Sequence, residues 1–265
     1  MEQRAASNSQ TAIVTGGSRG LGRGIVAALA TRNMRVVALA KDAGRLAVTV
    51  KELGVESVVA DVTDPNTSAR LLRDLTPDLV VLCAGALPVL RPIQELTWET
   101  FSLNWEVDTK ATFNWIRDAL LLPLKRGSHI VVISSIASIL GSPLSGSYAG
   151  AKGMQRLITE FAVEESARLK LDIRFHCLLP TLNPNTDLGR ATMVAYSRRA
   201  GLTIEQFAKR FDPPLTPDII GRVVIDLHES PERWNKTSYR VSGDGLVPLD
   251  EVVRVQQAAA SIKSR

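Results

Sequence analysis

The chain has 265 residues, a formal net charge of +5, and 45% hydrophobic against 22% charged residues. This composition supplies a core for one α/β domain and argues against an intrinsically disordered chain. Lys and Arg are scattered without a run of five or more, so we expect no nucleic-acid partner. Cys83 and Cys177 are the two cysteines, each inside an apolar run, which predicts buried thiols rather than a disulfide or a metal site.

The start of the chain and its apolar runs bear on location. Residues 1–10 are polar and lack the apolar segment of a signal peptide, and we expect them to be disordered. No apolar run reaches the roughly 18 residues that a membrane-spanning helix needs. The sequence therefore predicts a cytoplasmic protein with no membrane partner.

A glycine-rich turn near the start of the chain has the pattern of a phosphate-binding site. Residues 11–15 read as a buried strand, residues 16–22 as the turn and residues 25–31 as a helix. Glycines let the backbone approach a pyrophosphate, and a helix N-terminus offers unpaired N–H groups and partial positive charge. The spacing is T-G-x-x-x-G-x-G, beginning at Thr15. Strand, turn and helix together predict a dinucleotide-binding unit.

The end of the second predicted strand, residues 34–40, bears on the type of cofactor. An NAD site usually places an acidic residue there for the ribose 2′-hydroxyl, whereas a 2′-phosphate needs positive charge. Here the strand runs into Lys41, and Arg19 lies in the glycine turn. These two cations favour NADP(H) over NAD(H). Asp42 either opposes that preference or starts the next helix, residues 43–53.

Two further strands follow, at residues 57–60 and 79–82. Asp61 comes directly after the first, where it can accept a hydrogen bond from the adenine amino group and can also cap the helix that begins at residues 64–65. The second ends in Cys-Ala-Gly at 83–85, small residues that let a flat cofactor lie close. The alternation of strands and helices predicts an α/β fold, a Rossmann-type doubly wound parallel sheet in a single domain.

The second half of the chain continues the alternation and then loses it. We expect a long helix at 97–124, a strand at 129–133, a helix at 148–169 and a strand at 173–179. Past Pro180, the segment at about 181–217 is long and weakly patterned, which is typical of a substrate lid. Its scattered cations are either solvated or a sign of an acidic substrate.

The last predicted elements are a helix at 217–228 and a short strand with its turn at 239–245. We therefore assign residues 11–245 to the nucleotide-binding domain and 246–265 to a C-terminal tail.

Tyr148 and Lys152 are four positions apart, a spacing that suits an acid-base pair in one active site. Residues four apart lie on one face of a helix, so the phenol and the ammonium can point into the same cleft. Bringing a tyrosine from its reference pKa of about 10 to near 7 takes about 4 kcal/mol, and a fixed positive charge acts in that direction. Ser135 follows the strand at 129–133, where its hydroxyl can face the same cleft. Tyrosine and lysine four apart also occur by chance, so the rest of the chain carries the assignment.

Taken together, the glycine turn, Asp61, the Cys-Ala-Gly triplet, Ser135 and the Tyr148–Lys152 spacing resemble the short-chain dehydrogenase/reductase family over about residues 10–245. The resemblance implies a Rossmann-type fold with a seven-stranded sheet, a nicotinamide cofactor, and homodimers or homotetramers built on the two long helices. It also implies that Tyr148 is the general acid or base, that Ser135 polarises the substrate oxygen, and that Lys152 binds the nicotinamide ribose and lowers the pKa of Tyr148. No metal is implied. The expected cofactor contacts are Gly16, Ser18, Arg19, Gly20, Leu21, Gly22, Lys41, Asp61, Val62, Cys83, Ala84, Gly85, Tyr148, Lys152, Pro180, Leu182 and Asn183.

Three positions depart from the family pattern. Cys83 stands where the family has an asparagine that ties strands together, and Thr181 replaces the glycine of the usual Pro-Gly. Asp108 occupies the position of the catalytic asparagine, with Asn104 one helical turn too early. An ionised Asp108 would keep Lys152 protonated and offset part of the positive field at Tyr148. We therefore count Asp108 among the catalytic residues and expect it to slow or redirect proton transfer without abolishing binding.

The expected function is that of an NADPH-dependent oxidoreductase. A hydride would pass between the nicotinamide and a carbonyl or alcohol of a small or medium organic substrate, with Tyr148 as general acid or base. Two alternatives remain open at this point: a non-redox reaction such as dehydration, isomerisation or cyclisation, and an NADP(H)-binding sensor or scaffold.

Overall fold

The computed structural model describes residues 10–122 and 124–250, and its centre is one eight-stranded sheet in the order β3-β2-β1-β4-β5-β6-β7-β8. The first seven strands run parallel, and β8 pairs antiparallel with β7. The strands are β1 (Gln10–Thr15), β2 (Met34–Ala40), β3 (Glu56–Val59), β4 (Leu79–Leu82), β5 (His129–Ile133), β6 (Arg174–Pro180), β7 (Ser238–Ser242) and β8 (Gly245–Pro248). The predicted doubly wound α/β fold is confirmed.

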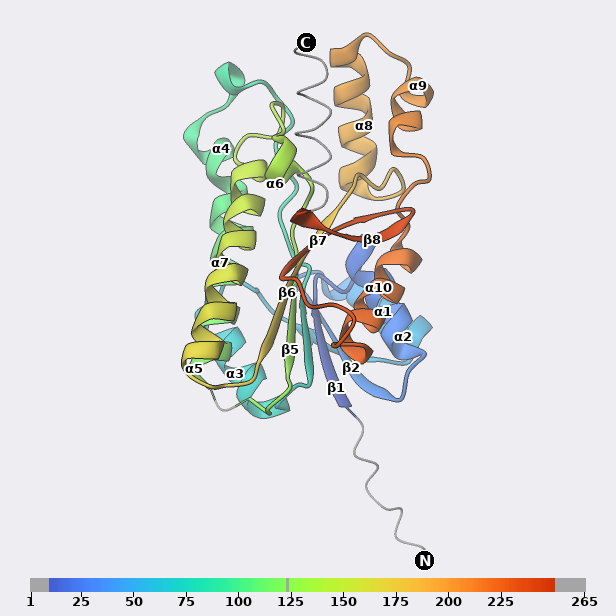
Figure 1. Cartoon of the computed structure of the whole chain (residues 1–265). Helices are drawn as coiled ribbons and strands as arrows, with labels where there is room; N and C mark the ends of the chain where they lie inside the picture. Colours follow the sequence, from blue (N-terminus) through green and yellow to red (C-terminus); the bar gives the residue numbers. More distant parts are fainter. Residues whose placement is uncertain (1–9, 123, 251–265) are drawn as a thin grey trace, which may run out of the picture.

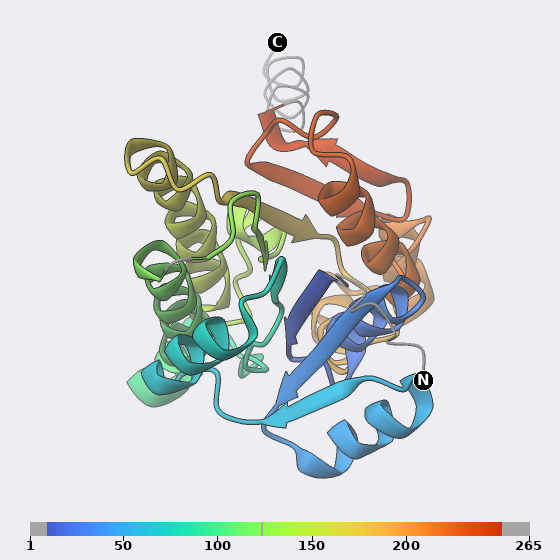
Figure 2. The ribbon, with the colours of Figure 1, turned by 90° about the horizontal axis from the view of Figure 1, so that it is seen from below.

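Helices cover both faces of the sheet (Figure 1). One face carries α3, α5 and α7, and the other carries α1, α2 and α10, an arrangement that Figure 2 shows from the end where the parallel strands begin. The helices are α1 (Gly20–Ala30), α2 (Ala43–Leu53), α3 (Pro65–Leu75), α4 (Trp98–Asn104), α5 (Lys110–Leu121), α6 (Ala137–Leu140), α7 (Tyr148–Arg168), α8 (Asp187–Ala200), α9 (Ile204–Ala208) and α10 (Pro217–Glu229), with 3-10 turns at Ile93–Glu95 and Lys209–Phe211 and a π-helical turn at Trp105–Thr109.

The core is divided by the sheet, because successive side chains of a strand point to opposite faces. In β1, Ala12 and Val14 pack on the side of α1 and α10, whereas Ile13 packs on the side of α3, α5 and α7. Trp115 of α5 is fully buried in the second layer. This two-layer core fixes the strands, and with them the row of loops at their carboxyl ends.

The predicted terminal segments fall mostly outside the described residues. Of residues 1–10, only Gln10 is described, and it is the first residue of β1. Of the predicted tail, residues 246–250 are described and include most of β8.

The expectation of a seven-stranded sheet is wrong, because the sheet has an eighth strand. The chain reverses direction after β7 and forms β8, which pairs with β7 through Ser242 and Gly245. Gly245 adopts a φ of +104°, and a Cβ on Gly243 would lie 2.1 Å from the carbonyl oxygen of Pro213. Both turn positions therefore require glycine. The four residues of β8 show no alternation that would have marked them as a strand.

The single long helix expected at 97–124 is also wrong. Thr97 caps α4, the π-helical turn Trp105–Thr109 interrupts the helix, and α5 ends at Leu121. A π turn inserts a residue into the helical register, and such turns are frequent at functional sites. Here it buries Asp108 completely beside the carboxyl end of the sheet.

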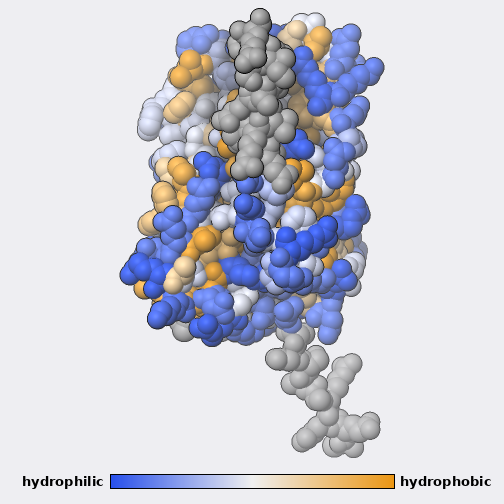
Figure 3. Space-filling model, in the orientation of Figure 1, coloured by the Kyte–Doolittle hydropathy of each residue, from blue (hydrophilic) through white to orange (hydrophobic). Residues whose placement is uncertain are grey.

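The surface shows no single dominant feature on the face of Figure 3, where hydrophilic side chains prevail and apolar patches are scattered between them. None of the described helices has both the length and the apolar composition for crossing a membrane.

Candidate active site

The glycine turn builds one wall of a cavity of about 250 Å³ at the carboxyl ends of β1 and β4. A Cβ on Gly16 would lie 2.9 Å from the backbone of Ala84, and one on Gly22 would lie 2.2 Å from the carbonyl oxygen of Gly16. No side chain caps α1, and its first turn carries no acidic residue. The free N–H groups and partial positive charge at this helix start suit a pyrophosphate, so the residues present fit a dinucleotide.

The backbone at Cys83, which stands in place of the family asparagine, is held by Thr15. The Thr15 hydroxyl accepts hydrogen bonds from the backbone N–H groups of Cys83 (3.0 Å) and Ala84 (3.1 Å) and donates to the carbonyl of Val81 (3.3 Å). β1 therefore holds the end of β4 without a side-chain amide. Burial raises the pKa of the Cys83 thiol to about 11, so it is a neutral wall of the cavity.

Thr181, in place of the family glycine, continues the sheet. Its N–H donates to the carbonyl of Val241 at 2.8 Å, one residue beyond β6. The backbone after Pro180 therefore stays paired with β7 before it turns toward α8.

The acidic residues after β2 and β3 have separate roles. Asp42 caps α2 by accepting from the N–H of Arg45 (3.0 Å), and Asp64 caps α3 by accepting from the N–H of Asn66. Asp61 is not the cap of α3, so that reading is wrong. Its carboxylate accepts from the N–H of Thr63 and forms an ion pair with Lys41 at 2.8 Å.

The structure brings most of the expected cofactor contacts to this cavity. Its lining includes Gly16, Arg19, Gly20, Leu21, Gly22, Cys83, Ala84, Gly85, Tyr148 and Lys152. Ser18, Lys41, Asp61 and Val62 do not line it, and the Val62 side chain is buried in the core. Pro180, Leu182 and Asn183 line the neighbouring cavity instead. Sequence reasoning missed the segment 185–188, although Thr186 followed by Asp187 carries the signal of a helix start.

Tyr148 and Lys152 lie in the first turns of α7, beside the end of β5. The Lys152 ammonium is 5.6 Å from the centre of the Tyr148 ring. Two bonds fix the lysine: its Nζ donates to the carbonyl of Ile133 (3.2 Å), and the Ser134 hydroxyl donates to its backbone carbonyl (2.7 Å). Ser135 lines the same neighbouring cavity as Tyr148. The structure thus brings the three residues of the predicted catalytic set together.

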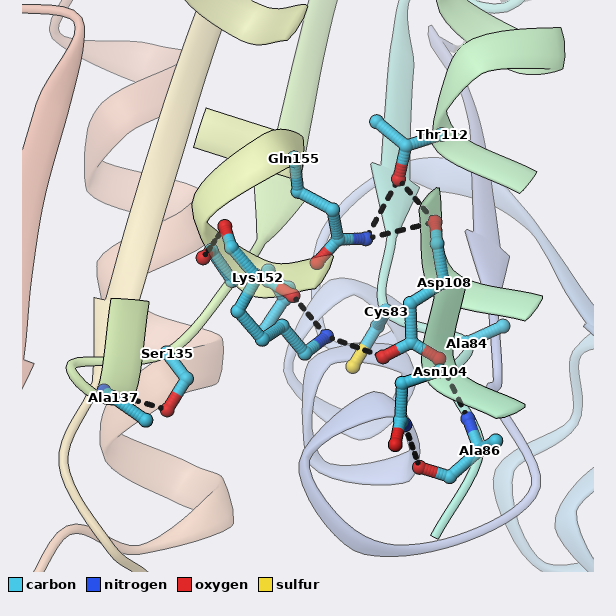
Figure 4. A network of polar contacts seen from close by, with 12 residues as sticks. Cys83, Ala84, Ala86, Asn104, Asp108, Thr112, Ser135, Ala137, Lys152 and Gln155 are labelled. Atoms are coloured by element: carbon cyan, nitrogen blue, oxygen red, sulfur yellow. Dashed lines mark hydrogen bonds and ion pairs between the residues drawn. The ribbon is translucent and has the colours of Figure 1, made fainter. Parts of the chain in front are cut away.

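Asp108 lies directly against Lys152, with 3.1 Å between Oδ2 and Nζ (Figure 4). Both side chains are buried, at 0% and 7% exposure. The contact is an ion pair rather than an aligned hydrogen bond. The other carboxylate oxygen accepts from the N–H of Ala86 at 2.8 Å. A Cβ on Gly85 would lie 2.9 Å from Asp108, so glycine is needed for this close approach.

Asn104, which the sequence places one turn too early, holds the same loop. Its amide donates to the carbonyl of Ala86 at 2.8 Å, while Asp108 accepts from the N–H of that residue. The π turn between them lets both side chains reach one peptide segment. Asn104 is therefore a positioning residue that sequence reasoning set aside.

Burial dominates the electrostatics of Tyr148. It raises the pKa of Tyr148, the positive charge of Lys152 and the Ser135 hydroxyl act in the lowering direction, and the charge of Asp108 raises it further. Lys152 therefore acts on the pKa of Tyr148 in the expected, lowering direction, but desolvation of the buried phenol outweighs it. For Lys152, burial acts in the lowering direction, but the charges of Asp108 and Tyr148 outweigh it and raise the pKa. At neutral pH the site holds a protonated phenol beside an ammonium.

A second cavity, of about 230 Å³, begins at Tyr148 and extends beneath α8 and α9. Three aromatic side chains, Tyr196, Phe207 and Phe211, form part of its wall, and none of its lining residues carries a charge. The Tyr196 hydroxyl contacts the Ser142 hydroxyl at 2.7 Å and accepts from the N–H of Leu144, which ties α8 to the loop before α7.

The chain is similar to known proteins in both sequence and fold. The family model described as short chain dehydrogenase matches residues 10–193. The hydroxynaphthalene reductase-like protein Arp2 of Metarhizium majus is 29% identical over 85% of this chain and 90% of its own. L-xylulose reductase of Homo sapiens is 31% identical over 68% of this chain and 74% of its own. The crystal structure of levodione reductase superposes with a TM-score of 0.77 at 19% identity, covering 88% of this chain and 96% of the other. The chain belongs to the short-chain dehydrogenase/reductase family.

Proposed function

We propose that the chain is an NADPH-dependent oxidoreductase that interconverts a carbonyl and an alcohol on a small or medium organic substrate. The observation that carries the proposal is that Tyr148 lines both cavities, the glycine-walled one and the aromatic one. A group placed between the two would meet its phenol. The similarity to a carbonyl reductase [NADPH] of Sus scrofa, 29% identical over 64% of this chain and 70% of its own, supports a redox role.

The protein's own residues would handle the proton. Tyr148 would be protonated at neutral pH, since burial raises a pKa that is already about 10 in a free tyrosine, and it would donate to the substrate oxygen during reduction. Ser135 would donate a hydrogen bond to the same oxygen, and Lys152 would stabilise the phenolate that remains. When bound, the nicotinamide would supply or accept the hydride.

The proposed preference for NADP(H) is supported by three cations in the glycine turn and just after β2. Arg19 lies in the glycine turn, and Lys41 and Arg45 follow β2. A 2′-phosphate adds charge and acceptor oxygens that such side chains can bind.

The second cavity bears on the substrate. Its uncharged wall with Tyr196, Phe207 and Phe211 favours a neutral, apolar, ring-containing carbonyl compound over the acidic substrate that the cations of residues 181–217 left open. Asn183, 4% exposed, has an amide nitrogen without a partner and lines this cavity. We propose that it donates to an oxygen of the bound ligand, and that α8 and α9 act as the lid.

Self-association stays a proposal. The helices α5 and α7 expose Phe113 (52%), Leu121 (67%) and Phe161 (56%), which supports a homodimer or homotetramer through these helices. The cytoplasmic location, and the absence of nucleic-acid and membrane partners, also stay predictions.

The test is cofactor consumption. The full chain is incubated with NADPH and a panel of neutral cyclic and aromatic ketones, with carboxylate-bearing analogues of the same ring systems as controls. We expect NADPH oxidation with the neutral members and little with the acids. Turnover of a substrate without a change in NADPH would favour the non-redox alternative. Dinucleotide binding without turnover of any member would favour the sensor or scaffold.

A further inference from the structure

Asp187, the first residue of the lid helix α8, lies close to arginines from three segments: the glycine turn, α2 and α8 itself. Its Oδ2 lies 2.6 Å from Arg19 of the glycine turn and 3.9 Å from Arg45 of α2. Its Oδ1 lies 2.5 Å from Arg190, one turn further along α8. These charges lower the pKa of Asp187, led by the hydrogen bond from Arg19, so the carboxylate is ionised at neutral pH. Asp187 lines the cofactor cleft itself.

The cations expected to recognise a 2′-phosphate are therefore already paired. Arg19 binds Asp187, Lys41 binds Asp61 at 2.8 Å, and Arg45 lies 3.4 Å from Asp42. Sequence reasoning counted Arg19 and Lys41 as a positive site, but each faces a carboxylate. The positive potential offered to a phosphate is correspondingly smaller than two unpaired cations would give.

Another anion can replace Asp187 as the partner of Arg19. The two side chains of the pair are 43% and 42% exposed, and exposed ion pairs contribute little free energy. A phosphate offers a larger charge and three acceptor oxygens to the same guanidinium. When Arg19 leaves, Arg190 remains bound to Asp187, so the carboxylate is not left unpaired.

We infer that Asp187 competes with the 2′-phosphate of NADP(H) for Arg19 and thereby sets how strongly the protein distinguishes NADP(H) from NAD(H). NAD(H) lacks that phosphate and leaves the Arg19–Asp187 pair in place. Asp187 is thus a specificity-determining residue that weakens the discrimination. The inference rests on the proposed dinucleotide-dependent function.

The experiment compares dissociation constants of NADPH and NADH, measured by isothermal titration with the full chain and with Asp187→Asn. The substitution keeps the size of the side chain and removes its charge. We expect NADPH to bind up to about fivefold more tightly, the scale of one exposed ion pair, while the NADH constant changes less than about twofold. Asp218→Asn is the matched control: Asp218 lies in the first turn of α10, pairs with an arginine and is exposed, and the variant should leave both constants unchanged.

A second variant tests the opposite direction. Arg190→Gln removes the arginine nearest to Oδ1 of Asp187 and leaves only the more distant Arg45 beside Arg19. The carboxylate then depends more on Arg19, and NADPH should bind more weakly while NADH does not. Three outcomes for Asp187→Asn overturn the inference: an equal gain for both dinucleotides, an unchanged NADPH constant, or a loss of NADPH binding. If the unmodified chain binds neither dinucleotide, the proposed function itself fails, which the titration of that chain alone reveals.

Discussion

The two ends of the parallel sheet each bury a cluster of titratable groups. One cluster contains a charged pair, and the other consists of histidines whose uncharged form is favoured. At the carboxyl end, Lys152 and Asp108 form a buried ion pair beside Tyr148. At the amino end, the three histidines of the chain lie together, and burial lowers the pKa of each, which favours the uncharged form at neutral pH. The strand β5 connects both, since its last carbonyl accepts from Lys152 and its first residue is His129.

The hydrogen bonds of the histidine cluster define its protonation. The carbonyl of Trp234 can only accept, so His176 donates to it through Nε2 (3.2 Å) and uses Nδ1 as an acceptor. His129 then donates from its Nε2 to His176 Nδ1 at 2.7 Å, which leaves its own Nδ1 buried without a partner. His228 stacks on His129 with a 5.8 Å separation of ring centres. Burial lowers the pKa of all three.

The two clusters differ in how they accommodate buried titratable groups. A buried charge needs a partner of opposite sign, and at the catalytic end the pair sets the field at Tyr148. A buried histidine can instead stay neutral, at the cost of instability in acid. If the end of Tyr148 carries out the proposed proton transfer and the histidine end serves packing, substitutions at the two ends should separate activity from stability.

The largest expected effect is on activity at the catalytic end. Tyr148→Phe removes the proton donor and should reduce turnover by roughly 100-fold or more, with little change in the free energy of unfolding. His176→Gln keeps a donor and an acceptor at the histidine end and should leave turnover unchanged. The check is the rate of NADPH oxidation with a substrate found in the panel above. Near-normal turnover by Tyr148→Phe would refute its assignment.

The next effect is on stability at the histidine end. Burial moves the pKa of His176 from 6.5 to about 4, below that of the unfolded chain. The unfolded state thus binds more protons, and this stabilising contribution, complete above pH of about 6.5, is lost as pH falls. His176 alone corresponds to roughly 3 kcal/mol by pH 4. Urea unfolding followed from neutral pH to about 4.5 measures the loss, and His176→Gln should flatten the dependence. An equally steep curve for that variant would exclude the histidine.

The smallest effect is the pH profile of Asp108→Asn. Asp108 raises the pKa of both Tyr148 and Lys152, so its removal should lower both. Reduction needs a protonated Tyr148, and the alkaline limb of its pH-rate profile should therefore move to lower pH. The substitution also leaves the buried Lys152 ammonium without an opposite charge, and one amide oxygen must serve both the Ala86 N–H and Lys152, which predicts a loss of stability measurable by urea unfolding. An unchanged rate and profile would remove Asp108 from the mechanism.

The sequence predicted most strands and helices because their signals are local. The strands β2, β4 and β5 and the helix α2 have the expected bounds, since each is a periodic or apolar run with clear turn residues. The π turn at Trp105–Thr109 was not predicted because helical periodicity hides an inserted residue. The strand β8 was not predicted because it begins with Gly245, ends with Pro248 and has neither the alternation nor the apolar run that marked β4.

The candidate site divides in the same way. The sequence by itself determined the glycine turn, the spacing of Tyr148 and Lys152 along one helix, and the presence of Asp108 near the family position, because these depend on neighbours in the chain. Only the tertiary structure decided that Asp108 contacts Lys152 directly and that Arg19 pairs with Asp187, 168 positions away. It also decided the direction in which the pKa of Tyr148 moves, because that depends on burial by segments distant in sequence.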